Sequence, residues 1–324
     1  MNISLFDAHC DTGSVALREG KNLRENDLHV DFTRQKRYGR CAQVFAVYVR
    51  REVGNFEDMD YSKDQSAEVL VPKADRLLSF ISGEIGKNGD LVTLCRSAAE
   101  IKAANDAGKT AALISVEGAE LLGCDFARLR DAYARGVRIV NLVWNYDNAV
   151  CGAANGISGG GLSPRGREFV LAMQEMGMAV DLSHASERTF WEVCEIAKKP
   201  VFCSHSDAKA LCDHPRNLTD GQFMQLVKMG GVAGLNLYPL FLDDNGDADI
   251  ETVVEHAEHF LSLGGEKAVC LGGDWDGVDY LPDGLTGIES VGEVYEAMLR
   301  RNWKEDLVRD IFYNNLFEFM EKVL

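Results

Sequence analysis

The sequence predicts an α/β fold, a (β/α)8 barrel of the TIM type formed by a single domain over residues 1–324. Short apolar runs rich in β-branched residues alternate with patterns of helical period, which indicates a parallel sheet covered by helices. Polar residues stand at the ends of several of these runs, where a closed barrel would gather them on one rim. An open doubly wound sheet would explain the alternation but not the shared position of the polar residues.

Eight apolar runs are expected to form the strands. Helical patterns such as DFARLRDAYARG, REFVLAMQEMG, ERTFWEVCEIAKK and IETVVEHAEHFLSLGG separate most of them. The eight runs are ISLFDAH from Ile3, AQVFAVYV from Ala42, TAALISVE from Thr110, VRIVNLVW from Val137, MAVDLSH from Met178, PVFCSH from Pro200, GVAGLNLY from Gly231 and AVCLGGD from Ala268.

A long interval follows the second run, from Arg50 to Lys109. It contains two helical patterns, near SAEVLVPKADRLLSFISGEIG and RSAAEIKAANDAG, so we expect a helical excursion after the second strand rather than a second domain. The glycine-rich piece GISGGGLSPRG matches no phosphate-binding motif and is expected to be a loop that leads into a helix.

Charge and cysteine content restrict the possible partners. The chain has 34 Lys and Arg against 51 Asp and Glu, a net charge of −17, which disfavours nucleic acid and anionic membranes as partners. No stretch approaches the roughly 20 apolar residues of a membrane span, and no signal-peptide pattern opens the chain. The nine cysteines show no CxxC spacing, which favours reduced thiols and a cytoplasmic location.

His9 and Asp11 lie two residues apart at the end of the first run, so both side chains could reach one cation from the same face of a strand. The alternative is a polar strand end hydrogen-bonded to a loop. Glu117 ends another apolar run, and its burial requires either a bound cation or a salt bridge to Arg or Lys.

His184 and His205 end two consecutive runs, each after a serine, and imidazoles on strands about 4.8 Å apart could converge on one cation. Either histidine alone could instead be a hydrogen-bonded core residue. The other four histidines lack this placement; they are His29, His214, His256 and His259. Of these, His256 and His259 are one helical turn apart and are expected on the surface.

Three more charged residues are candidates for the chemistry. Asp274 and Asp276 follow the last run in GGDWDG, where a carboxylate near cations could take a proton from water, or could stabilise a turn. Arg216, in CDHPRNLTD, could hold a substrate carboxylate with its guanidinium fork, or could be an ordinary solvated or structural arginine.

These motifs, in order, resemble those of the renal (membrane) dipeptidase family, peptidase family M19, within the amidohydrolase-like metal-dependent hydrolases. The matching pieces are DAHCDT, SVEGAE, GVRIVNL, MAVDLSHAS, PVFCSHSDAKALCDHPRNLTD, GGVAGLNLY and GGDWDG.

The resemblance implies two divalent ions, zinc being the expected metal. It implies His9 and Asp11 on one ion, Glu117 as a bridge, and His184 and His205 on the other. It further implies Asp274 as the catalytic acid and base, Arg216 as the anchor of the substrate's terminal carboxylate, and a homodimer.

One departure from the family concerns a histidine that commonly steadies the scissile carbonyl, in a segment like LTH. This chain reads NLVWN there, which places Trp144 near that position with Asn145 beside it. The indole N–H or the Asn amide could donate the same hydrogen bond, but neither can become a cation.

With this resemblance, the expected function is that of a zinc-dependent dipeptidase that hydrolyses dipeptides through a hydroxide bridging the two ions. The resemblance also implies that the C-terminal residue of the substrate can have D or L configuration. Two alternatives are open. One is a related binuclear hydrolase acting on N-acyl amino acids or lactones, and the other is a non-catalytic metal-binding barrel.

Overall fold

The structure is a computed structural model that describes residues 3–49 and 66–324, so the start of the predicted excursion lies outside the described residues. The strands are β1 (Leu5–Cys10), β2 (Cys41–Val47), β3 (Val92–Leu94), β4 (Thr110–Glu117), β5 (Val137–Asn141), β6 (Ala179–Asp181), β7 (Ala233–Leu235) and β8 (Val269–Leu271).

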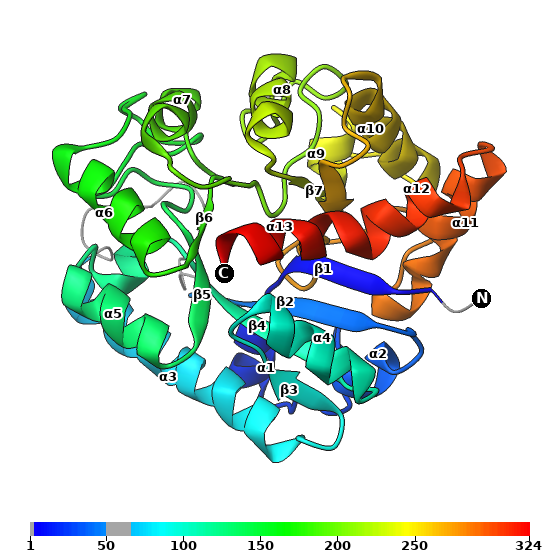
Figure 1. Cartoon of the computed structure of the whole chain (residues 1–324), viewed down its shortest axis with the longest axis horizontal. Helices are drawn as coiled ribbons and strands as arrows, with labels where there is room; N and C mark the ends of the chain where they lie inside the picture. Colours follow the sequence, from blue (N-terminus) through cyan, green and yellow to red (C-terminus); the bar gives the residue numbers. More distant parts are fainter. Residues whose placement is uncertain (1–2, 50–65) are drawn as a thin grey trace.

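The helices surround these strands in Figure 1. They are α1 (Thr12–Glu19), α2 (Phe32–Gln35), α3 (Ala67–Lys87), α4 (Ala98–Asp106), α5 (Phe126–Ala134), α6 (Pro164–Glu175), α7 (Glu187–Ile196), α8 (Asp220–Met229), α9 (Pro239–Leu242), α10 (Ile250–Ser262), α11 (Gly292–Arg300), α12 (Glu305–Arg309) and α13 (Asn315–Val323), the last preceded by a π-helical turn, Asp310–Asn314.

The strands pair in parallel in the order β6-β5-β4-β2-β1-β8-β7. Residues 202 and 203 close the ring between its two ends, since Phe202 bridges to Asp181 of β6 and Cys203 bridges to Ala233 of β7. Backbone hydrogen bonds run on both sides of this link, from Leu182 N to Phe202 O (2.8 Å) and from Cys203 N to Val232 O (3.0 Å). The predicted barrel is confirmed.

Two details differ from the predicted strands. The run from Pro200 contributes only this pair of bridging residues rather than a full strand. The excursion holds a short strand that the sequence did not reveal, β3, which pairs with the first half of β4 through Val92 and Thr110. The helical character of the excursion is confirmed by α3 and α4.

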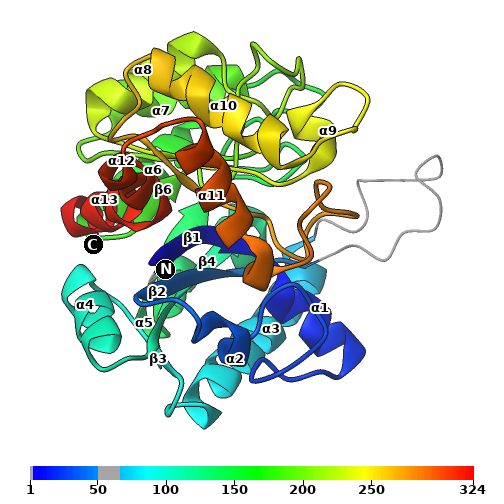
Figure 2. The same cartoon turned by 90° about the vertical axis from the view of Figure 1, so that its right-hand side faces the viewer.

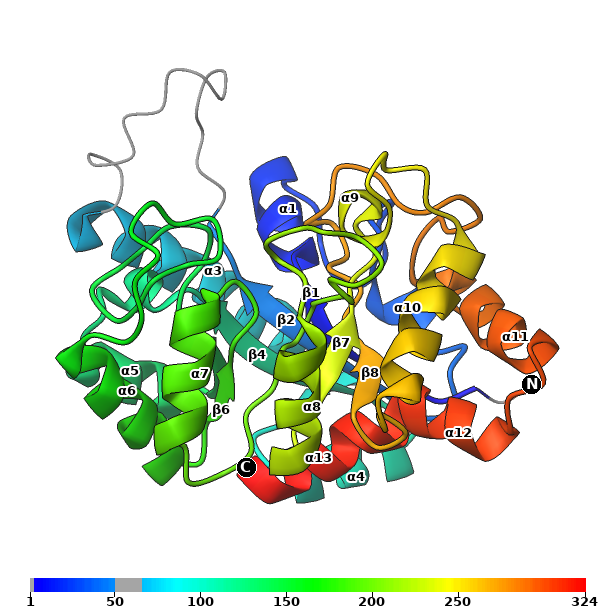
Figure 3. The ribbon, with the colours of Figure 1, turned by 90° about the horizontal axis from the view of Figure 1, so that it is seen from above.

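The apolar core forms two layers. The outer layer lies between strands and helices, and Figure 2 shows β1 and β2 between α8 and α10 on one side and α2 and α3 on the other. The inner layer fills the barrel and continues onto α13, where Phe202 and Phe319 have ring centroids 4.8 Å apart. In Figure 3, α13 lies at one end of the molecule and α1 and α9 lie at the opposite end.

Local sequence sets where the helices begin. Side chains accept hydrogen bonds from the first-turn backbone N–H groups of most helices, as expected for N-caps. The capping residues are Asp31, Ser97, Asp125, Ser163, Ser186, Thr219 and Asp249. Within the described ranges, no helix is both long enough and apolar enough to cross a membrane.

Candidate metal centre

The polar side chains predicted from the strand ends meet at the carboxyl end of the barrel. His9 lies on β1, Glu117 ends β4, His184 follows β6, and His205 follows the bridging residues 202 and 203. The rings of His9 and His205 have centroids 4.1 Å apart, and those of His184 and His205 lie 5.0 Å apart. Side chains far apart in the sequence therefore share one buried cluster.

A β-bulge aims His9 into this cluster. Between Asp7 and Cys10, β1 advances by three residues while β2 advances by two, from Gln43 to Phe45. Such an extra residue breaks the strict alternation of faces and re-aims a side chain. Asp7 consequently contacts Gln43, whereas His9 lies against Glu117, with its Nε2 3.7 Å from Oε2.

Asp11 occupies the N-cap position of α1, but its carboxylate makes no cap hydrogen bond. It turns instead toward the cluster, where its Oδ1 lies 3.8 Å from His9 Nε2. Asp274, after β8, has its Oδ1 at the same distance from that nitrogen. Thus His9 is bordered by three carboxylates, those of Asp11, Glu117 and Asp274.

The two oxygens of Glu117 face different histidines. Oε2 faces His9, while Oε1 lies 2.8 Å from His184 Nε2 and 3.6 Å from His205 Nε2. This arrangement produces two sets of ligand atoms, and within each set all atoms lie within 4.8 Å of one another. One set comes from His9, Glu117 and His205, and the other from His9, Asp11 and Asp274.

Several of these buried atoms have no hydrogen-bond partner among the described residues. They are Nδ1 and Nε2 of His9, Oδ1 of Asp11 and Oε2 of Glu117. Unsatisfied buried polar atoms destabilise a fold unless something satisfies them, and imidazole and carboxylate are the donors that divalent transition metals prefer. The residues present therefore fit divalent metal ions.

The pKa values of the cluster also fit a site for divalent metal ions. Burial, and then the neighbouring carboxylates, raise the pKa values of Asp11 and Glu117 well above their ordinary range. Burial lowers the pKa of His9 to about 3, with a smaller contribution from Arg216, and places the pKa values of His184 and His205 well below the usual range. A histidine binds a metal ion as the neutral imidazole, and a carboxyl group binds it as the carboxylate. The histidines are therefore already in the binding form, and the carboxyl groups reach it when they release their protons.

Hydrogen bonds outside the cluster orient two of the imidazoles. Asn145 Oδ1 lies 2.8 Å from Nδ1 of His184, and Ser204 Oγ lies 2.7 Å from Nδ1 of His205. In both rings Nε2 is left to face Glu117. The side chain of Asn145 therefore orients His184 in this structure, whereas Trp144 contacts the rings of Tyr48 and Tyr146 and lies 6.3 Å, between ring centroids, from His184.

Asp274 is held from one side by Asn236, which donates from Nδ2 to Oδ2 over 3.2 Å. Asn236 follows β7 and is completely buried. Asn236 was not among the residues predicted from the sequence, because it lies inside the run GVAGLNLY, with Leu237 and Tyr238 after it. Burial raises the pKa of Asp274 to about 6, while Asn236 and Arg216 partly oppose the rise.

Arg216 is 4% exposed and lines a small cavity beside His184 and Ser206. Its Nε and Nη2 donate to no described residue. It is therefore not the solvated arginine of the alternative interpretation. Asp276, by contrast, accepts from the Thr12 hydroxyl and from the backbone N–H of His29, so its carboxylate stabilises the turn after β8.

The prediction that His256 lies on the surface was wrong. His256 is completely buried in α10, where its Nδ1 accepts from the backbone N–H of Ala208 and its Nε2 pairs with the carbonyl of Leu242. His259 is partly exposed and pairs with Asp220. The position of His256 was readable from its neighbours, because Val253, Ala257 and Phe260 of the same helix face are buried.

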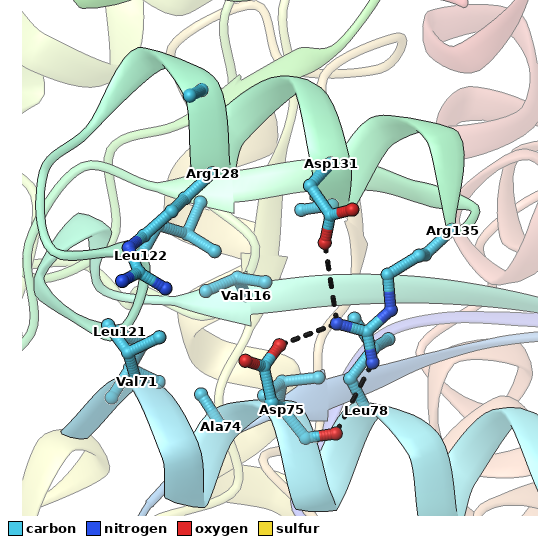
Figure 4. A pocket seen from close by; sticks show the side chains of 13 residues that line it. Val71, Ala74, Asp75, Leu78, Val116, Leu121, Leu122, Arg128, Asp131 and Arg135 are labelled. Atoms are coloured by element: carbon cyan, nitrogen blue, oxygen red, sulfur yellow. Dashed lines mark hydrogen bonds and ion pairs between the residues drawn. The ribbon is translucent and has the colours of Figure 1, made fainter. Parts of the chain in front are cut away.

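A larger cavity lies outside the barrel wall, between α3 and α5 (Figure 4). Its walls are mostly apolar, and Arg135 closes it by pairing with Asp75 of α3 at 2.5 Å and with Asp131 of α5 at 3.6 Å. Both carboxylates on its walls are paired with Arg135, so the described residues of this cavity offer no free acid or base for chemistry.

The sequence model described as "Membrane dipeptidase (Peptidase family M19)" matches residues 1–324. Two uncharacterized dipeptidases of Schizosaccharomyces pombe are similar to the chain. One is 35% identical over 63% of this chain and 51% of its own length, and the other is 32% identical over 89% and 71%. The chain thus spans about half the length of the first of these relatives.

Solved structures share the fold. A metallopeptidase from Rhodobacter sphaeroides, liganded with a phosphinate mimic of the dipeptide L-Ala-D-Ala, has a TM-score of 0.89, 24% identity and coverage of 100% of both chains. Dipeptidase AC, a metallopeptidase of family M19, has a TM-score of 0.86 and 26% identity over 100% of this chain and 99% of its own. Because the family model matches residues 1–324, the chain belongs to the membrane dipeptidase family, peptidase family M19.

Proposed function

We propose that this protein is a dipeptidase that uses two divalent metal ions, with zinc as the expected metal, and that residues 1–324 act as a single domain. The observation that carries the proposal is the meeting of two sets of ligand atoms at the barrel mouth, which share His9 and include several buried atoms with no hydrogen-bond partner among the described residues. Membership of the M19 family supports hydrolysis of a peptide bond.

His9 and Asp11 would hold one ion, His184 and His205 would hold the other, and Glu117 would bridge them. The two oxygens of Glu117 support this division, since one faces His9 and the other faces both remaining histidines. When bound, two such ions would polarise the scissile carbonyl and lower the pKa of an intervening water toward about 7.

Asp274 is the proposed proton carrier. Its pKa of about 6 suits a group that accepts a proton from the attacking water and passes it to the leaving amine near neutral pH. Its position beside His9 and Asp11 supports this role, and the hydrogen bond from Asn236 restricts its rotation.

Arg216 is the proposed anchor for the C-terminal carboxylate of the substrate. A buried guanidinium with two unpartnered donors can bind a carboxylate in bidentate fashion, and it neighbours His184 on the wall of the same cavity. The dipeptide mimic in the Rhodobacter structure supports a substrate of this size and permits a D residue at the C-terminal position.

Trp144 is the proposed donor to the scissile carbonyl at the position where the family commonly has histidine. Asn145, the other candidate, already binds His184 through Oδ1, so its part in substrate binding would have to come from the remaining amide group. A cytoplasmic location and a homodimer also remain proposals of the sequence and of the family resemblance.

The test compares chelator-treated protein with protein reloaded with zinc, manganese or cobalt. The substrates are the four stereoisomers of Ala-Ala, matched N-acetylamino acids and a lactone. Metal-dependent cleavage of dipeptides alone would support the proposal. Turnover of only the acyl or lactone substrates would favour the related hydrolase, and two bound ions without turnover of any substrate would favour the non-catalytic barrel.

A further inference from the structure

Three other carboxylates are buried beneath the proposed metal ligands, and the mechanism above does not use them. Asp7, Asp181 and Asp207 are each at most 1% exposed. They are close in sequence to the ligands: Asp7 is two residues before His9, Asp181 three before His184, and Asp207 two after His205. We call these three residues the carboxylate collar.

Asp7 connects β1 to the loop that carries Asp274. Its Oδ1 accepts from the backbone N–H of His9 (3.0 Å) and from Gln43 Nε2 (2.8 Å). Its Oδ2 accepts from the backbone N–H of Gly273 (2.9 Å) and the indole N–H of Trp275 (3.1 Å). All four donors are neutral, and the first lies within the bulge that aims His9.

Asp181 and Asp207 make the corresponding connections on the other side of the barrel. Asp181 Oδ1 accepts from the backbone N–H of Ser183 (2.9 Å) and of Ser204 (3.0 Å), the residues that directly precede His184 and His205. Asp207 Oδ1 accepts from the backbone N–H of Asn236 (3.1 Å), whose side chain holds Asp274.

We infer that the carboxylate collar positions the metal centre by joining neighbouring strand ends where the parallel hydrogen-bond ladder stops. Each of its members accepts backbone N–H groups that would otherwise be buried without a partner, and each such group belongs to, or lies beside, a residue of the proposed centre. The collar residues are positioning residues and touch neither substrate nor ion. This inference rests on the proposed function for its link to metal binding.

The number of carboxylate oxygens that accept hydrogen bonds predicts the effect of replacing Asp7 or Asp181 by asparagine. Asp7 uses both oxygens, so in Asp7→Asn the amide NH2 must face two N–H donors. Asp181 uses one oxygen, and its Oδ2 has no partner among the described residues, so Asp181→Asn can keep both bonds while Asp181→Ala loses them. A collar that acts through hydrogen bonds therefore separates Asn from Ala at residue 181.

The first experiment measures amide hydrogen exchange in the metal-free variants with residue resolution. We expect Asp7→Asn to speed exchange at His9 and Gly273 but not at Ser183 and Ser204, and Asp181→Ala to do the reverse. Asp181→Asn should resemble the unmodified chain. Exchange that is unchanged, or that rises evenly around the barrel, would overturn the inference. If Asp7→Asn does not fold, the two variants at residue 181 decide.

The second experiment measures zinc affinity by competition with a chromophoric chelator. We expect Asp7→Asn and Asp181→Ala to weaken zinc binding by about 10- to 100-fold, the usual effect of losing an outer-shell partner. Asp181→Asn should leave it unchanged. Glu84→Gln is the matched control. Glu84 is a buried carboxylate on α3, outside the barrel mouth, and it accepts a hydrogen bond from the backbone N–H of Leu23 (3.0 Å).

Equal zinc affinity in all four variants would overturn the inference, as would an equal loss in the Glu84 control. A chain that takes up two ions but cleaves no dipeptide would refute the proposed function alone, since exchange and affinity would still test the collar.

Discussion

Arg216→Met tests whether the buried guanidinium serves the substrate or the fold. Methionine keeps a long, flexible side chain in the cavity but removes the charge and all donors. In a structural role, arginine would leave buried acceptors unsatisfied on removal. The structure shows the opposite situation, because Nε and Nη2 of Arg216 donate to no described residue and burial lowers its pKa.

The expected effect follows from the bonds that the guanidinium can offer to a carboxylate. A hydrogen bond to a charged group contributes about 1.5–3 kcal/mol, so a bidentate pair at the lower limit contributes about 3 kcal/mol. That corresponds to a factor of about 150 in binding. We expect KM for Ala-Ala to rise by about 10² while the free energy of unfolding stays equal or increases, since a desolvated charge is removed.

The assay is a double-mutant cycle between the protein and the substrate. kcat and KM are measured for Ala-Ala and for its C-terminal amide, with the unmodified chain and with Arg216→Met. Capping the carboxylate should weaken the unmodified enzyme by about 10² and the variant very little. A variant that still suffers the full penalty of capping would refute the anchor role, and a variant that unfolds would assign Arg216 to the fold.

Asp274→Asn should keep its metal and lose about 10²–10⁴ in kcat, measured by metal analysis and steady-state kinetics, and full activity would remove Asp274 from proton transfer. Gly277→Ala would place a Cβ 2.2 Å from Asp274 Oδ1 and 2.6 Å from Asp11 Oδ2, so it should lose both metal and activity, and a normal zinc content would contradict that steric reasoning. Zinc binding should release protons and tighten as pH rises, because burial raises the pKa values of Asp11 and Glu117; calorimetry in buffers of different ionisation enthalpy measures the release, and none is the contrary result. The metal-free protein should also lose stability as pH rises above the ordinary histidine pKa of 6.5, because Asp11 and Glu117, whose folded pKa values are raised well above their ordinary range, bind more protons in the folded state than in the unfolded state. Thermal unfolding of chelator-treated protein measures this, and a stability that rises over the same range would contradict it.

The ends of the strands were the most predictable part of this protein. His9, Glu117, His184 and Asp274 each end a mostly apolar run, and a residue that ends such a run in a parallel barrel lies at the mouth. Asn236 escaped this rule, because Leu237 and Tyr238 continue its run beyond it. A three-residue strand such as β3 carries too few residues for a periodic pattern, so it could not be distinguished from a loop.

Contacts between segments were not readable from one sequence. The bulge in β1 depends on register with β2, and simple alternation would have put Asp7 on the same face as His9. The pairing of Asn145 with His184 also depends on how the loop after β5 returns over β6. Propensity describes a segment by itself, whereas these features require knowledge of what lies next to it.

Since β1 pairs with β8, and Asp11 N bonds to Trp275 O at 2.7 Å, the first strand acquires its second neighbour only when residues beyond 269 have been synthesised. A nascent chain leaving the ribosome therefore holds His9 and Asp11 early but meets Asp274 late. Because α13 packs on the opposite end of the same barrel, the inner core layer is not covered until α13 has also emerged. Loading of the proposed ions would therefore have to follow synthesis of β8 and Asp274.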